Sequence, residues 1–173
     1  MLVNELEYWY LTPTPMANES ISHFMGRFRR ENQLSVSMLA TITGLGGAIA
    51  RWEKFRFNPP PTQKELEKLA EFVRLDTKDL QLMLPPQGTG MKLEPIRLCS
   101  SCYLESPCHQ IQWQFKTSDR CFIHNLTLLS ECPFCGARFR IPSEWEQGKC
   151  HRCFTPIQQM IAFQKKLKFS VTE

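Results

Sequence analysis

The first 98 residues of this 173-residue chain contain no cysteine, and all eight cysteines lie after residue 98. Thiolate-bound metals and disulfides therefore cannot hold the N-terminal half, which must be stabilised by an apolar core. The later segment is short enough to need cross-links or metals. This distribution favours two small units over one uniform domain.

A basic and then apolar leader is also missing, because acids and prolines interrupt the opening residues MLVNELEYWYLTPTP. No apolar run is long enough for a transmembrane helix. We therefore expect a bacterial cytoplasmic protein that does not associate with a membrane. In such a reducing compartment cysteines serve more often as metal ligands than as disulfides.

The sequence has no glycine-rich phosphate loop, no nucleophile elbow and no HExxH pair. Each of these motifs would supply a phosphate cradle, a nucleophile or a catalytic metal site. Without them we expect a protein that is not an enzyme and has no small-molecule substrate.

Residues 18–90 are expected to form a helical domain that follows an extended arm at residues 1–17. Asn18 could cap the first helix, with Glu19 in its first turn. The apolar positions that recur at helical spacing in this helix are Ile21, Phe24, Met25 and Phe28.

A second helix is expected to begin at a Ser35 cap and to stop at Gly44. Its buried side would consist of Met38, Leu39 and Ile42. The spacing of these three residues predicts that they share one face of an amphipathic helix.

A third helix is expected from Ala48 to Phe55, with Trp52 facing inward. It ends before a run of three prolines. Thr62 and Glu65 form a capping box for a fourth helix, and a short fifth helix follows an Asp76 cap. The sequence thus predicts a bundle of five short helices.

The tract from residue 34 to residue 80 resembles the helix-turn-helix of phage-repressor-type regulators. Base readout is not expected, because the third helix begins with Gly46, Gly47 and Ala48, none of which can make a bidentate base contact. Three basic residues could contact nucleic-acid phosphates, or could equally be solvated surface charges: Arg51, Lys54 and Arg56.

Four residue pairs with the same two-residue gap follow one another in the C-terminal half. They are Cys99 and Cys102, Cys121 and His124, Cys132 and Cys135, and Cys150 and Cys153. A two-residue gap lets a tight turn direct both side chains at one tetrahedral ion, and two such turns complete a structural zinc site. The sequence predicts two structural zinc ions without an open position for an activating water.

Sequential pairing would give a first zinc finger at residues 91–128 and a second zinc ribbon at residues 129–155, followed by a helical tail at 156–173. An interleaved cross-brace is also compatible with the spacing. The fold class is then a small α-helical domain followed by two zinc modules with a little irregular β-structure. Three nearby residues, Cys108, His109 and His151, are interpreted as non-ligands. His109 could nevertheless replace His124 in the first site.

The formal net charge of +4 counts cysteines as neutral. A dication bound by three thiolates and a histidine carries about −1, and one bound by four thiolates about −2, so the effective charge falls to about +1. Diffuse attraction to a phosphate backbone therefore cannot be the main driver of function.

The order of motifs along both halves is distinctive. An ESxxxxxxRxxxxN-like opening is followed by a CxxC pair, a tryptophan, a CxxH pair and CPxCG. The matching residues are Glu19, Ser20, Arg27, Asn32, Cys99, Cys102, Trp113, Cys121, His124, Leu128, Cys132, Pro133, Cys135 and Gly136. This set resembles the TniQ family of transposition proteins.

The resemblance is to the minimal TniQ form of type V CRISPR-associated transposons, since the long DNA-reading extension of many relatives is missing. It implies a non-catalytic adaptor between the guide-RNA-bound CRISPR effector and TnsC, the AAA+ ATPase that recruits the transposase. Contact with target DNA or the guide-RNA backbone would fit this role. The alternative is a stand-alone zinc-containing helix-turn-helix regulator that binds DNA.

The extended arm contains three adjacent aromatic residues, Tyr8, Trp9 and Tyr10. Three neighbours cannot all face one interior, so at least one is expected to stay exposed or to pack back on the domain. If exposed, these rings are candidates for the TnsC contact, because large amphipathic rings dominate interface energetics.

Overall fold

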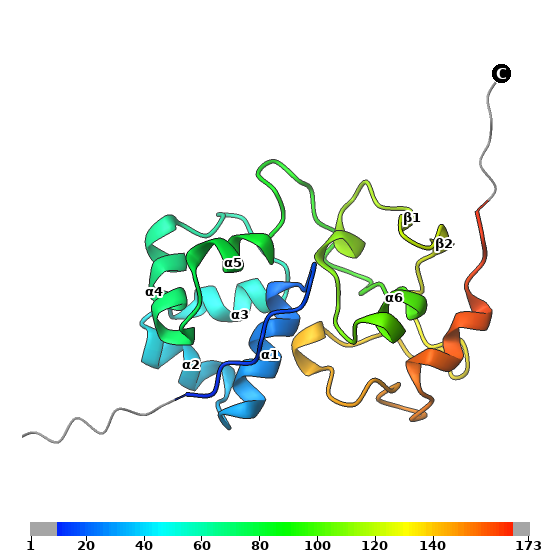
Figure 1. Ribbon diagram of the computed structural model, residues 1–173, viewed down its shortest axis with the longest axis horizontal. Coiled ribbons are helices and arrows are strands. Elements are labelled where there is room, and N and C mark those ends of the chain that lie inside the picture. The colour runs from blue at the N-terminus through cyan, green and yellow to red at the C-terminus, as the bar shows by residue number, and fades with distance from the viewer. Residues whose placement is uncertain (1–9, 168–173) are drawn as a thin grey trace, which may run out of the picture.

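The structure is a computed structural model that describes residues 10–167 of the chain. Figure 1 shows the helices of the N-terminal half gathered on one side and the short elements of the C-terminal half on the other, with α1 near the boundary. Among the described residues, no helix has the length and apolar character needed to cross a membrane.

From residue 10 onward, five helices form the N-terminal half: α1 (Ile21–Glu31), α2 (Val36–Thr43), α3 (Gly47–Glu53), α4 (Gln63–Val73) and α5 (Thr77–Leu82). Their apolar faces share one core, in which Phe24, Phe28, Ile49, Trp52 and Leu69 are fully buried. The predicted helical bundle with Trp52 at its centre is confirmed.

The first helix begins later than the sequence suggested. Its cap is Ser20, whose hydroxyl accepts a hydrogen bond from the His23 amide at 3.3 Å. Asn18 instead adopts a left-handed backbone conformation with φ of 59°, and Glu19 precedes the helix as a buried carboxylate. Asparagine tolerates this conformation better than most residues, so the position suits a turn.

The second helix begins and ends as predicted, but its buried face is narrower. Ser35 caps it and Gly44 ends it with φ of 66°. Leu39 is fully buried, whereas Met38 and Ile42 are 48% and 46% exposed, which corrects their assignment to the core. A helix of eight residues contacts α3 and α4 along one side, and Met38 and Ile42, one turn apart, lie on another.

The fourth and fifth helices start where their caps predict. The Glu65 amide donates to the Thr62 hydroxyl at 3.2 Å, and the Glu65 carboxylate accepts from the Thr62 amide at 2.8 Å. This is the predicted capping box. The Asp76 carboxylate caps α5 by accepting from the Lys78 amide at 2.9 Å.

The C-terminal half consists of short elements around a core rich in cysteine. They are α6 (Ser100–Glu105), the 3₁₀ helix η1 (Ile111–Gln114), the strands β1 (Arg120–Cys121) and β2 (Leu126–Thr127), and the 3₁₀ helices η2 (Pro142–Glu144) and η3 (Ile157–Phe163). The strands pair antiparallel, with Cys121 opposite Leu126. Leu98, Trp113 and Met160 are among the buried side chains that accompany the cysteines.

The tail is only partly helical. After η3 the chain runs extended beside β2, where the Thr127 amide donates to the Lys165 carbonyl at 2.9 Å and Leu126 forms an antiparallel bridge with Lys166. The free edge of β2 offers hydrogen-bond partners to an extended chain, whereas a helix would bond its backbone groups internally. This explains why the segment is extended. Residues 168–173 of the expected helical tail lie outside the described residues.

The two halves meet along a buried contact between α1 and η2. The Ser22 hydroxyl donates to the Glu53 carbonyl at 2.7 Å and accepts from the Ser143 amide at 3.2 Å. Gly26 lies directly against the Ser143 backbone, so a side chain at this position would have no room. The two halves therefore pack directly against one another.

Candidate metal centres

The first cluster combines two turns of the C-terminal half. Cys99 caps α6 and Cys102 lies in its first turn, while Cys121 ends β1 and His124 lies in the loop before β2. The four donor atoms all lie within 4.8 Å of one another. His124 Nδ1 lies 3.2 Å from Cys102 Sγ, 3.7 Å from Cys121 Sγ and 3.8 Å from Cys99 Sγ.

The second cluster consists of Cys132, Cys135, Cys150 and Cys153, whose donor atoms also lie within 4.8 Å of one another. Cys132 Sγ lies 3.6 Å from Cys153 Sγ, and Cys135 Sγ lies 3.7 Å from Cys150 Sγ. Each distance joins one turn to the other, so both turns face a common centre.

A left-handed residue follows three of the four turns. Asn125, Gly136 and Phe154 have φ of 52°, 68° and 59°. In the second cluster, the Gly136 amide donates to the Cys132 carbonyl at 2.8 Å and the Phe154 amide to the Cys150 carbonyl at 3.0 Å. These bonds close each turn and bring its two sulfurs to the same side. Glycine after Cys135 signals this turn in the sequence, whereas phenylalanine after Cys153 does not.

The spacing of the donor atoms fits a tetrahedral ion. With Zn–S near 2.3 Å and Zn–N near 2.05 Å, a tetrahedron places two sulfurs about 3.8 Å apart and a nitrogen and a sulfur about 3.6 Å apart. Three sulfur pairs, Cys102–Cys121, Cys132–Cys153 and Cys135–Cys150, are 3.4, 3.6 and 3.7 Å apart, and the sulfurs of the first cluster lie 3.2 to 3.8 Å from His124 Nδ1. All donor atoms of each cluster lie within 4.8 Å of one another. Both clusters are geometrically suited to binding a metal ion.

The structure groups the four turns in sequential order and not as an interleaved cross-brace. All eight cysteines are free, and Cys102 Sγ and Cys121 Sγ are 3.4 Å apart, against about 2.05 Å in a disulfide. Cys108, His109 and His151 belong to neither cluster. Cys108 is buried beside the Ala17 carbonyl, and His151 is exposed.

Comparison with known families adds the decisive observation. The TniQ family model matches residues 10–128, which is more than half of the chain. The chain belongs to the TniQ family. It is therefore a transposition-associated protein, of an accessory family that is generally non-catalytic. A search of curated proteins found no match to the chain. The part of this TniQ protein that the family model matches includes the helical half and the first cluster, and the second cluster follows it.

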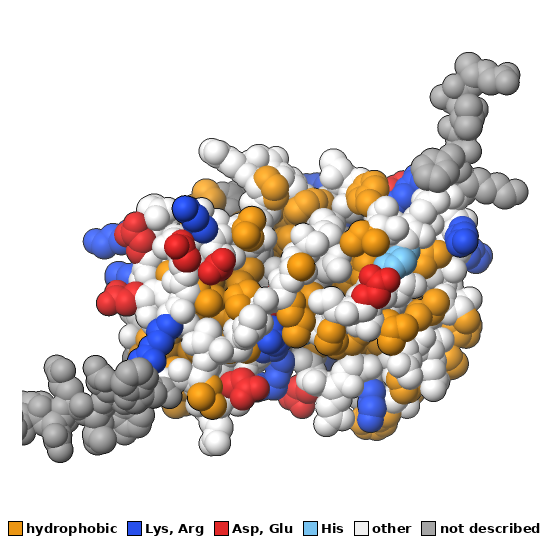
Figure 2. Space-filling model, in the orientation of Figure 1, with side chains coloured by type: hydrophobic (Ala, Val, Ile, Leu, Met, Phe, Trp, Pro, Cys, Tyr) orange, Lys and Arg blue, Asp and Glu red, His pale blue; other side chains and the backbone are white. Residues whose placement is uncertain are grey.

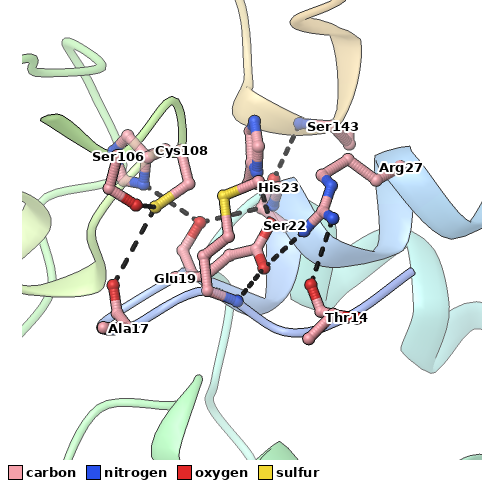
Figure 3. A network of polar contacts seen from close by, with 12 residues as sticks. Thr14, Ala17, Glu19, Ser22, His23, Arg27, Ser106, Cys108 and Ser143 are labelled. Carbon is pink, nitrogen blue, oxygen red and sulfur yellow. Dashed lines mark hydrogen bonds and ion pairs between the residues drawn. The ribbon is translucent and has the colours of Figure 1, made fainter. Parts of the chain in front are cut away.

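The acidic residue of the opening motif forms a buried network in this TniQ protein. The Glu19 carboxylate accepts from Arg27 Nη1 at 2.8 and 2.9 Å and lies 2.5 Å from His23 Nδ1 (Figure 3). Burial raises the pKa of Glu19, but His23, the Met16 amide and Arg27 together outweigh it, so that the pKa is lowered. Sequence reasoning missed this network, although Glu19, His23 and Arg27 recur every four residues.

The other two residues of this motif fasten segments that are distant in sequence. The Ser20 amide donates to the His109 carbonyl at 2.8 Å, and the Ser20 hydroxyl lies 3.0 Å from His109 Nδ1. Asn32 accepts from the Leu11 amide at 2.7 Å and donates to the Leu11 carbonyl at 2.8 Å. The motif thus holds the arm on α1, and α1 on the C-terminal half.

Of the three aromatic residues predicted to contact a partner, only Tyr10 lies within the described residues. Tyr8 and Trp9 lie outside the described residues. Tyr10 is half-buried, and its ring centre lies 4.7 Å from that of Phe72 and 6.3 Å from that of Phe28. This ring packs back on the helical half.

The three basic residues named as phosphate contacts lie in or just after α3. Lys54 and Arg56 are exposed, whereas Arg51 is half-buried and donates to the Pro59 carbonyl at 3.3 Å. Gly46 and Gly47, at the start of α3, are exposed and carry no side chain that could read a base.

Hydrophobic side chains are visible over much of the C-terminal half in Figure 2. Four exposed hydrophobic side chains of this half belong to the turns of the two clusters or directly follow one: Phe122, Ile123, Phe134 and Phe154 are 67%, 60%, 51% and 70% exposed. Side chains of this size are common in protein contacts.

Proposed function

We propose that this TniQ protein is a non-catalytic adaptor in RNA-guided DNA transposition. It joins the CRISPR effector and its guide RNA to the AAA+ ATPase TnsC, which recruits the transposase. The observation that carries the proposal is the TniQ match over residues 10–128. Such a role places the protein in the bacterial cytoplasm.

Two structural zinc ions are part of this proposal. The first ion would be held by Cys99, Cys102, Cys121 and His124, and the second by Cys132, Cys135, Cys150 and Cys153. Zinc supplies folding free energy to such a module when it binds. Four protein ligands at each ion leave no position for a catalytic water, which supports a structural role.

An adaptor needs surfaces for proteins more than a general attraction for nucleic acid. The exposed Phe122, Ile123, Phe134 and Phe154 provide such a surface on a part of the molecule that the metal clusters would hold rigid. Arg51, Lys54 and Arg56 are proposed to contact the phosphates of the guide RNA or of the target DNA.

A reconstituted mixture of guide-bound effector, ATP-bound TnsC and this protein tests the adaptor role. We expect one complex that contains all three components in size-exclusion chromatography, and none between effector and TnsC when the protein is left out. Failure to bridge them, together with enrichment of a sequence motif in duplex DNA selection, would favour the stand-alone DNA-binding regulator.

The aromatic arm is proposed as the TnsC contact. Because Tyr10 packs on Phe72, its replacement is expected to cost stability as well as binding. Trp9→Ala is therefore the sharper variant, and we expect it to abolish TnsC association in a pull-down while the thermal midpoint stays unchanged. Phe72→Leu provides a control for damage to the packing of the arm. Parental TnsC binding by Trp9→Ala would exclude Trp9 as the anchor.

A further inference from the structure

The hydrogen bond between Glu105 and His124 determines which imidazole nitrogen can face a metal. Glu105 is the last residue of α6, and its carboxylate Oε1 lies 2.9 Å from His124 Nε2. An ionised carboxylate can only accept a hydrogen bond, so Nε2 carries the hydrogen. In the neutral imidazole, which is the form that binds a metal, Nδ1 is then left with its lone pair, and Nδ1 is the nitrogen that faces the three sulfurs at 3.2–3.8 Å.

A second outer contact comes from Gln164, which directly follows η3. Its Oε1 accepts from the Ser100 amide at 2.9 Å, and its Nε2 donates to the Thr127 carbonyl at 2.6 Å. Both partners are backbone groups of fixed polarity, so the orientation of the amide is determined. The side chain is only 8% exposed, as expected for a group with both ends satisfied.

The partners of Gln164 lie in or next to the two turns that make up the first cluster. Ser100 lies between Cys99 and Cys102, and Thr127 lies in β2, which leaves the turn containing Cys121 and His124. One buried side chain therefore ties the two turns together from a position 64 residues after Ser100.

We propose that Glu105 and Gln164 are positioning residues for the first metal site, Glu105 by fixing the metal-binding tautomer of His124 and Gln164 by holding the two ligand turns in register. The inference rests on the proposed metal binding of this cluster. Outer contacts of this kind typically change metal affinity 10–100-fold when they are removed. The second cluster contains no histidine and lies outside these contacts, so it serves as an internal reference.

Cobalt(II) is a suitable probe, because a site with one nitrogen and three sulfurs absorbs at different wavelengths from a site with four sulfurs. The protein is loaded with two equivalents, and the loss of each band is followed after a chelator is added. We expect the band of the first cluster to decay 10–100-fold faster in Glu105→Ala and in Gln164→Glu than in the parent. Gln164→Glu keeps an acceptor for Ser100 but loses the donor to Thr127.

Conservative and matched variants separate positioning from general damage. Glu105→Gln retains an acceptor oxygen for His124 Nε2 and is expected to restore most of the parental retention. Glu71→Ala and Gln159→Ala remove exposed side chains of the same types, and both bands should decay at parental rates. Parental decay of the first band in Glu105→Ala and Gln164→Glu would overturn the inference, and so would equal acceleration of both bands. A parent that binds no cobalt would overturn the proposed metal site, and this inference with it.

Discussion

Gly26 on α1 offers the sharpest test of how the two halves are joined. A Cβ at this position would lie 2.5 Å from Ser143 Cα and 2.7 Å from Ser143 C, where ordinary contacts begin at 3.4 Å. Gly26→Ala must therefore move η2 away from α1 by about 1 Å, against backbone atoms that cannot rotate aside.

The expected cost can be estimated from the contacts that this movement disturbs. Overpacking of this kind costs about 1–3 kcal/mol. Ser143 makes two hydrogen bonds that the movement would stretch: its amide donates to the Ser22 hydroxyl, and its carbonyl accepts from Arg30. Losing each bond would lower the free energy of unfolding by about 1 kcal/mol. Replacing a helical glycine with alanine returns up to about 1 kcal/mol. We expect a net loss of about 2–4 kcal/mol in the free energy of unfolding.

Gly47→Ala provides the matched control, because Gly47 lies in α3 and no neighbouring atom lies within 4 Å of the position that an alanine Cβ would occupy there. It should unfold at or slightly above the parental urea concentration. Hydrogen exchange of the Ser143 amide should accelerate in Gly26→Ala alone. If Gly26→Ala unfolds like Gly47→Ala and the Ser143 amide stays protected, the close contact between the halves is wrong.

Three further predictions concern the metal sites, the helical core and the buried carboxylate. Cys135→Ser should lower the bound zinc from two equivalents to one in metal analysis, whereas Cys108→Ser should leave two. Trp52→Ala should lower the free energy of unfolding by about 3–5 kcal/mol in urea titrations, since Trp52 is fully buried. Because the pKa of Glu19 is lowered from 4.5 by folding, its contribution is full at neutral pH and is lost as the pH falls below 4.5. The stability gap between the parent and Glu19→Gln should therefore narrow on acidification in urea titrations; a constant gap would contradict the assignment.

The local features of the fold could be predicted where one short segment decides the outcome. The caps at Ser35, Thr62 and Asp76 were readable because a hydroxyl or carboxylate satisfies amides only two or three residues away. The start of α1 could not be predicted in this way, because Ser20 contacts His109, which lies 89 residues later in the chain. This distant contact places the cap at Ser20 and not at Asn18.

The same distinction applies to the candidate site. The two-residue spacing identified both sets of clustered side chains, because each turn is local. The contact from Gln164 to Ser100 has no sequence signal, since a single glutamine far along the chain is indistinguishable from a surface residue. The predicted burial of Met38 and Ile42 was wrong for a related reason. Helical periodicity shows which residues share a face, but it does not show which face packs against a neighbouring element.

His109 explains why the cysteine-rich half and the helical half should not unfold independently. It is fully buried, and its ring centre lies 5.3 Å from those of Phe55 and Trp113 and 5.4 Å from that of Trp145. Burial holds the pKa of His109 well below its usual value, so the ring is neutral and packs as an aromatic group. The same residue holds the cap of α1 through Ser20. His109 lies in the segment that connects the two ligand turns of the first cluster, so the geometry of that cluster and the first turn of α1 depend on one another. In the proposed adaptor role, a partner that binds the C-terminal half would therefore bind a unit that shares buried contacts with the helical bundle.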